Sequence, residues 1–217
     1  MTKTAIAMLV AAAGIASADI NLENVDRSGY QTFTATGIEI GAQNRGGVAP
    51  TQYDNIAAGP GGYVAFPASN VNPLGVADYQ SVATNNIAMD EFTFVGGVDV
   101  AGETVFFDFF DAGGNFVDGF GVALSQAGNF IWTITIGGGV EAAAGGFVQM
   151  SIDTGGFVNG NGQWFLSDGV AAVGDALAED AGGGNNFNFG ITGTEVPAPG
   201  AFALLGLGGM VASRRRR

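Results

Sequence analysis

The sequence predicts an all-β fold, a β-sandwich of jelly-roll-like form. Short apolar runs recur at intervals of about 10–15 residues, with turn-forming residues between them. The chain's 38 glycines lower its helix propensity and supply those turns. Its 17 phenylalanines provide large apolar surfaces whose burial offsets chain entropy, which argues against a disordered chain.

The clearest predicted strand covers residues 130–136. Trp132 and Ile134 fall on one face, and Thr133 and Thr135 fall on the other. Strict alternation of this kind is typical of a strand with one buried and one exposed face.

A second predicted strand, residues 103–110, is apolar on both faces. Val105 and Phe107 point one way, and Phe106 and Phe110 point the other. A strand covered on both sides is expected near the centre of a sheet. Further strands are predicted at 31–40, 87–95, 116–124, 147–152, 163–166 and 187–191. The glycine- and proline-rich stretch 41–75 is expected to form a long loop region with short strands.

The first 18 residues have the layout of a secretory signal. Lys3 supplies the early charge, an apolar run follows, and small residues occupy Ala16 and Ala18 before Asp19. We expect signal peptidase to cut after Ala18. The alternative, a buried helix of the fold, is less consistent with the small-residue pattern.

The C-terminal end has three parts in succession. Val196-Pro197-Ala198-Pro199 forms a boundary, because proline interrupts both helices and strands. A short apolar segment follows, expected to be a hydrophobic helix, and then four arginines, Arg214, Arg215, Arg216 and Arg217. The apolar segment is short for a membrane span, which needs about 20 residues, although snorkelling arginines extend its reach. The arginines would stay on the cytoplasmic side.

This C-terminal arrangement resembles the PEP-CTERM sorting signal. That signal has a Val-Pro-Glu-Pro-like motif, a hydrophobic helix and an arginine-rich end; here Ala198 stands where glutamate is commonest. The resemblance covers residues 196–217 only. It implies cleavage near the motif by an exosortase, a membrane protease, after transient anchoring in the inner membrane. The alternative is a permanent membrane anchor.

These boundaries divide the chain into four parts. We expect a signal peptide at 1–18, a sandwich domain at 19–191, a linker at 192–195 and a sorting signal at 196–217. The resemblance further implies an exported protein of the cell surface or extracellular matrix, with a structural or adhesive role in exopolysaccharide or biofilm material.

The charge distribution narrows the set of partners. Between residues 19 and 195 there are two cations, Arg27 and Arg45, against all twenty acidic residues, a net charge of about −18. Such a surface repels phosphates and anionic polysaccharide, so no nucleic-acid partner is expected. Cysteine and histidine are absent from the sequence, which excludes disulfides, Cys/His zinc sites and Ser-His-Asp triads.

A calcium site is one interpretation of the acidic residues around the glycine-rich hairpin at 111–115. The oxygen ligands would be Asp108, Asp111, Asn115 and Asp118. Calcium accepts such ligands, although the spacing does not match an EF-hand. The favoured interpretation is that these side chains shape the turn through hydrogen bonds to the backbone.

Trp164 is a second candidate, because it lies among amides and before an aspartate, a composition found in carbohydrate-binding platforms. Its strand-like surroundings favour core packing instead. A secreted carbohydrate-binding module, with or without calcium, is therefore the alternative function.

A secreted glycan hydrolase is the third hypothesis. It would need two carboxyl groups facing each other across a cleft. No spacing singles out such a pair among Glu91, Glu103 and Glu141. We therefore expect a protein that is not an enzyme and that needs no cofactor.

Overall fold

The computed structural model describes most of the predicted sandwich. The described residues are 25–40, 49–56, 60–67, 75–152, 161–167, 171–176 and 186–197. They form strands and no α-helix, so the all-β prediction is confirmed for this part of the chain. The strands are β1 (Thr32–Thr34), β2 (Thr36–Glu39), β3 (Thr51–Asp54), β4 (Pro60–Pro67), β5 (Gly75–Gln80), β6 (Ile87–Val98), β7 (Thr104–Asp111), β8 (Phe116–Ala123), β9 (Gly128–Thr135), β10 (Glu141–Ala142), β11 (Gly145–Ile152), β12 (Asn161–Ser167), β13 (Asp175–Ala176), β14 (Asn186–Phe187) and β15 (Phe189–Glu195).

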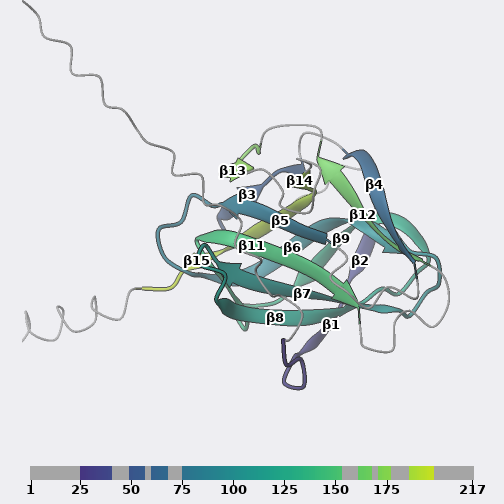
Figure 1. The fold of residues 1–217 in the computed structure, drawn as a ribbon, viewed down its shortest axis with the longest axis horizontal. Coiled ribbons are helices and arrows are strands. Elements are labelled where there is room, and N and C mark those ends of the chain that lie inside the picture. The colour runs from purple at the N-terminus through teal and green to yellow at the C-terminus, as the bar shows by residue number, and fades with distance from the viewer. Residues whose placement is uncertain are drawn as a thin grey trace, which may run out of the picture.

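The strands form two sheets, seen as two layers in Figure 1. The six-stranded sheet has the order β1-β8-β7-β11-β5-β13. β7 lies inside it, paired antiparallel with β8 on one side and β11 on the other. The prediction that residues 103–110 lie centrally in a sheet is therefore confirmed, and the turn at 111–115 joins β7 to β8 as a hairpin.

The nine-stranded sheet is built around β6. One edge of β6 pairs with β9, which in turn pairs with β2. The other edge of β6 is shared, since β15 pairs with residues 87–94 and β12 with residues 96–98. β3 pairs with β15, and β4 pairs with β12. Segments from both halves of the chain therefore meet on one sheet.

Aromatic side chains fill the space between the sheets. The ring of Phe92 on β6 lies 4.7 Å from the ring of Phe107 on β7, centroid to centroid. Trp132 and Ile134 are fully buried, while Thr133 and Thr135 lie on the opposite face of β9, as their alternation predicted. The two sheets thus share one hydrophobic core.

The last strand differs from the prediction in length. Residues 192–195 were expected to form a linker, yet β15 continues through Glu195. A register shift between Thr192 and Gly193 lets the strand go on pairing with β6. The span is polar because the end of the strand is exposed, and the strand is not interrupted there.

The predicted signal peptide, and all of the predicted sorting signal except Val196 and Pro197, fall outside the described residues. These include the cleavage-site residues Ala16, Ala18 and Asp19, the motif residues Ala198 and Pro199, and the arginine tail. Within the described ranges, no helix is long and apolar enough to span a membrane.

Candidate functional site

The hairpin between β7 and β8 is shaped by Asp111. Its Oδ1 accepts hydrogen bonds from the backbone N–H of Gly113 at 2.8 Å and of Asn115 at 2.9 Å. The Asn115 amide donates to Oδ2 at 2.9 Å. Hydrogen bonds from Asn115 hold the pKa of Asp111 below its usual range. Asp111 and Asn115 thus perform the turn chemistry that the sequence favoured.

Asp118 forms hydrogen bonds that are separate from those of Asp111 and Asn115. Its carboxylate accepts hydrogen bonds from the backbone N–H of Gly119 at 2.8 Å and of Glu141 at 3.0 Å. The second bond fixes β8 to the segment that begins β10. Within the part of the chain that the structure describes, no three acidic side chains gather as metal ligands.

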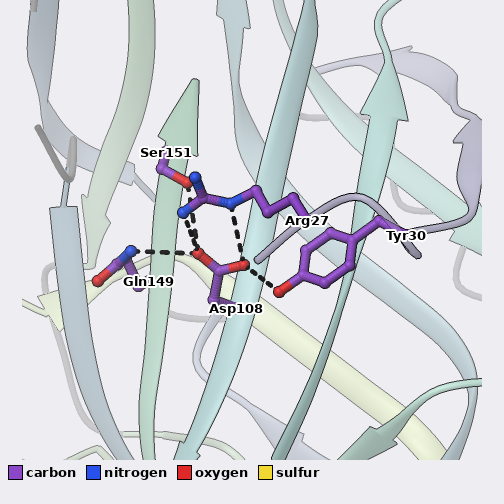
Figure 2. A network of polar contacts seen from close by, with 5 residues as sticks. All are labelled: Arg27, Tyr30, Asp108, Gln149 and Ser151. Carbon is purple, nitrogen blue, oxygen red and sulfur yellow. Dashed lines mark hydrogen bonds and ion pairs between the residues drawn. The ribbon is translucent and has the colours of Figure 1, made fainter. Parts of the chain in front are cut away.

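Asp108 lies apart from the hairpin, at the centre of a buried polar network (Figure 2). Arg27 Nη2 approaches its Oδ2 at 2.6 Å, and the Tyr30 hydroxyl donates to its Oδ1 at 2.6 Å. The Gln149 amide and the Ser151 hydroxyl also donate to Oδ2, at 3.1 and 3.4 Å. The carboxylate is fully buried and is saturated by protein donors.

This network fastens the N-terminal segment onto the six-stranded sheet. Asp108 and Gln149 face each other on β7 and β11, whereas Arg27 and Tyr30 come from the segment before β1 (Figure 2). The guanidinium also lies 5.5 Å from the ring centroid of Phe106, a cation–π contact. Burial, and then the hydrogen bond to Asp108, raise the pKa of Tyr30, so its hydroxyl remains a donor. The network is therefore a structural latch.

Trp164 is fully buried in the core. Its indole stacks on Phe187 with centroids 4.3 Å apart, and its Nε1 donates to the carbonyl of Asn188 at 3.1 Å. An indole in this position has no open face on which a sugar ring could stack. The strand that turns Trp164 inward turns its neighbours Gln163 and Phe165 toward the outer face of the nine-stranded sheet.

That outer face has an ordered pattern that the sequence analysis did not identify. It carries an apolar row, in which Ile38 is paired with Ile131, Ile131 with the buried Val95, and Phe165 with Tyr63. Tyr63 is 52% exposed, and its ring centroid lies 5.3 Å from that of Phe165. Tyr63 was missed because its glycine- and proline-rich surroundings indicated a loop, whereas the structure places it on β4.

A pair of amides lies on one side of the apolar row. Asn129 on β9 donates from Nδ2 to Gln163 Oε1 on β12 at 2.5 Å. β6 runs between these strands, and its residue at this level is Gly97, which is paired with both. A Cβ at Gly97 would meet Asn129 Oδ1 at 2.7 Å, so the amide bridge requires glycine there.

Hydroxyl groups lie on the other side of the apolar row. Thr36, Thr133 and Thr93 are paired in succession across β2, β9 and β6. Two positions further along the strands, a second row is again in register across β9, β6, β15 and β3. It consists of Thr135, Glu91, Thr192 and Thr51.

A small pocket of about 100 Å³ opens within this polar region. Its lining comprises Thr51, Tyr53, Asp54, Ile56, Glu91, Thr93, Gly190, Ile191 and Thr192. Burial raises the pKa of Glu91 above its ordinary value. One lining residue, Thr192, carries a buried hydroxyl oxygen with no hydrogen-bond partner among the described residues. This hydroxyl leaves hydrogen-bonding capacity unused beside the pocket.

The end of the fold adjoins the predicted sorting motif. The Glu195 carboxylate accepts hydrogen bonds from the Thr84 N–H, the Thr84 hydroxyl and the Asn85 amide, each at 3.1 Å. The backbone N–H of Val196 donates to the carbonyl of Asn86 at 2.7 Å. The chain is thus held to the sandwich up to the first residue of the motif.

Comparison with known proteins identifies no relative. No protein-family model matches the chain, and neither a curated protein nor a solved structure matches it.

Proposed function

We propose that this chain is an exported protein of the cell surface or extracellular matrix, sorted by an exosortase, with a structural or adhesive role in exopolysaccharide material. Signal peptidase releases it after Ala18, and the segment 196–217 anchors it transiently in the inner membrane. The proposal includes the finer fold assignment, a jelly-roll-like sandwich. This assignment is supported by the two sheets, each of which combines strands that are distant in the sequence.

One observation carries the proposal: the last strand ends at the residue before the motif. β15 is an inner strand of the nine-stranded sheet, paired with β6 on one side and β3 on the other. A cut before Gly190 would remove part of the sheet's interior. A cut at Pro197 or beyond would leave every described strand in place.

The arrangement of charged groups supports a role without catalysis. The carboxylates of Asp108, Asp111, Asp118 and Glu195 accept hydrogen bonds that hold turns and segments together. A catalytic carboxylate needs a lone pair or proton directed at a substrate. These four carboxylates instead serve the fold.

Removal of the arginine tail tests the sorting step. A chain lacking residues 214–217 should lose its normal distribution between envelope and medium, because the basic end holds the anchor on the cytoplasmic side. Its sandwich should melt as the full chain does, since every described strand ends before residue 198. Replacement of Glu39, an exposed residue on β2, by Gln is the matched control and should leave localisation unchanged. Normal localisation of the truncated chain would contradict the proposal.

A further inference from the structure

The apolar row on the outer face of the nine-stranded sheet ends in exposed aromatic rings, whereas Val95 within it is only 1% exposed. Its outermost member, Tyr63, is 52% exposed on a strand that pairs with β12 alone among the described strands. Phe165 lies next to it, with the two rings tilted by 47°. Exposed aromatic rings of this kind can pack against the apolar face of a ligand.

The polar groups beside this row fit a ligand rich in hydroxyl groups. The bridge from Asn129 to Gln163 lies on one side, and each amide keeps further donor or acceptor capacity. Threonine hydroxyls and the Glu91 carboxylate lie on the other side. A sugar ring combines an apolar face with hydroxyl groups along its edges, and the sheet presents the complementary pattern.

The charges on this surface restrict the ligand further. Arg27 is the only lysine or arginine among the described residues, and it is bound to Asp108 on the other sheet. The outer face carries Glu91 and Asp54, which repel phosphate, sulfate and carboxylate groups. These charges therefore disfavour anionic ligands, acidic polysaccharides included.

The pocket at Gly190 is of a size to admit the hydroxymethyl arm of a sugar unit. Gly190 lacks a side chain, and a Cβ added there would come to lie 3.5 Å from the Tyr53 carbonyl oxygen and 3.7 Å from Asp54 Oδ1. These are ordinary contacts, so glycine is not required by the packing at this position. The buried hydroxyl oxygen of Thr192 lacks a partner in the described part of the fold, and a ligand hydroxyl could supply one.

The geometry points to a binding site for a neutral polysaccharide on the outer face of the nine-stranded sheet. Tyr63 and Phe165 contact the apolar faces of the sugar rings. Asn129, Gln163 and the threonines bind their hydroxyl groups, and the pocket at Gly190 receives the hydroxymethyl arm of one unit. The inference rests on the proposed function in one respect: export brings this surface into contact with polysaccharide outside the cell.

Native gel electrophoresis of the purified full-length chain tests the site directly. The gels contain laminarin, galactomannan or hydroxyethyl cellulose as neutral probes and alginate as an anionic probe. At least one neutral polysaccharide should retard the protein, and alginate should not. Tyr63→Ala should weaken that binding about tenfold, the effect of losing one aromatic contact. Tyr63→Phe should retain most of it.

Two matched variants localise the effect. Gly190→Ala places a methyl group in the pocket without a steric clash and should weaken binding about threefold, a change that corresponds to roughly 0.7 kcal/mol. Phe116→Ala removes an exposed aromatic ring from the six-stranded sheet and should leave binding unchanged. Each variant is first shown to melt cooperatively, so that a lost fold is not mistaken for a lost site.

Several results would overturn the inference. They are the absence of retardation by every neutral probe, a preference for alginate, and equal binding by wild type and Tyr63→Ala. Reversible self-association that Tyr63→Ala abolishes, without retardation by any polysaccharide, would identify a second copy of the chain as the partner. None of these results affects sorting, which is read from localisation and processing in cells.

Discussion

Arg27 and Asp108 form an ion pair of 2.6 Å between Nη2 and Oδ2, across 81 positions of sequence. The carboxylate is fully buried, and the arginine side chain is 20% exposed. Because Asp108 lies on an inner strand and Arg27 precedes β1, the pair ties the start of the described chain to the middle of the six-stranded sheet.

Arg27→Ala should destabilise the sandwich strongly. It leaves the Asp108 charge buried without its cation, and breaking a buried pair in this way costs about 3–5 kcal/mol. Urea unfolding measures the loss. The double variant Arg27→Ala/Asp108→Asn should lose less than Arg27→Ala alone, because no charge remains buried. Equal losses in the two variants would show that the charge is not the source of the effect.

Asp111 should stabilise the hairpin in a pH-dependent way. Asp111→Ala removes hydrogen bonds to the turn and should lower stability at pH 7 by about 1 kcal/mol. The pKa of Asp111 is lowered in the fold from 3.8, so its contribution is present above that value. The contribution is lost as the pH falls through the folded-state pKa.

Unfolding of wild type and Asp111→Ala between pH 2 and 7 should therefore give curves that converge at the acidic end. Glu39→Gln, on the exposed surface, provides a control that should stay close to wild type. A stability difference that persists undiminished below the folded-state pKa would contradict this account.

Glu91→Gln should stabilise the protein at neutral pH. Burial raises the pKa of Glu91 above 4.5, so the folded state binds its proton more tightly than the unfolded chain does. Wild-type stability then falls as the pH rises through the interval between these two pKa values. The variant lacks that dependence, so its advantage should appear at pH 7 and disappear near pH 4. Lower stability of the variant at pH 7 would show that the carboxylate is favourably paired.

Two glycines on the same sheet face should respond differently to alanine. At Gly97 a Cβ would overlap the backbone carbonyl oxygen of Gly128, whereas at Gly190 its nearest contact is 3.5 Å. Gly97→Ala should lower stability by about 1–3 kcal/mol through overpacking and should break the amide bridge. Gly190→Ala should change stability little. Thermal melting compares them, and similar melting temperatures would contradict the described packing.

The sequence predicted those elements whose alternation is local. In residues 130–136 and 103–110, the order of side chains along the chain shows which face of the strand each residue occupies. These two strands and the hairpin at 111–115 are confirmed. Asp111 was correctly interpreted as a turn residue for the same reason, since its partners lie within four positions.

Long-range contacts explain what the sequence could not predict. Asp108 was grouped with its neighbours in the hairpin, yet its partner Arg27 comes from a distant segment. Tyr63 and Phe165 are neighbours only because β4 pairs with β12. Residues 192–195 had the polarity of a linker, and only their pairing with β6 makes them a strand.

The intact mass of the protein recovered from the envelope and medium of its native host tests the central claim most directly. The account predicts a chain that begins at Asp19 and ends within 196–199, just after the last strand, with or without an added group. A mass that extends through Arg217 would show a permanent anchor and would contradict sorting by an exosortase.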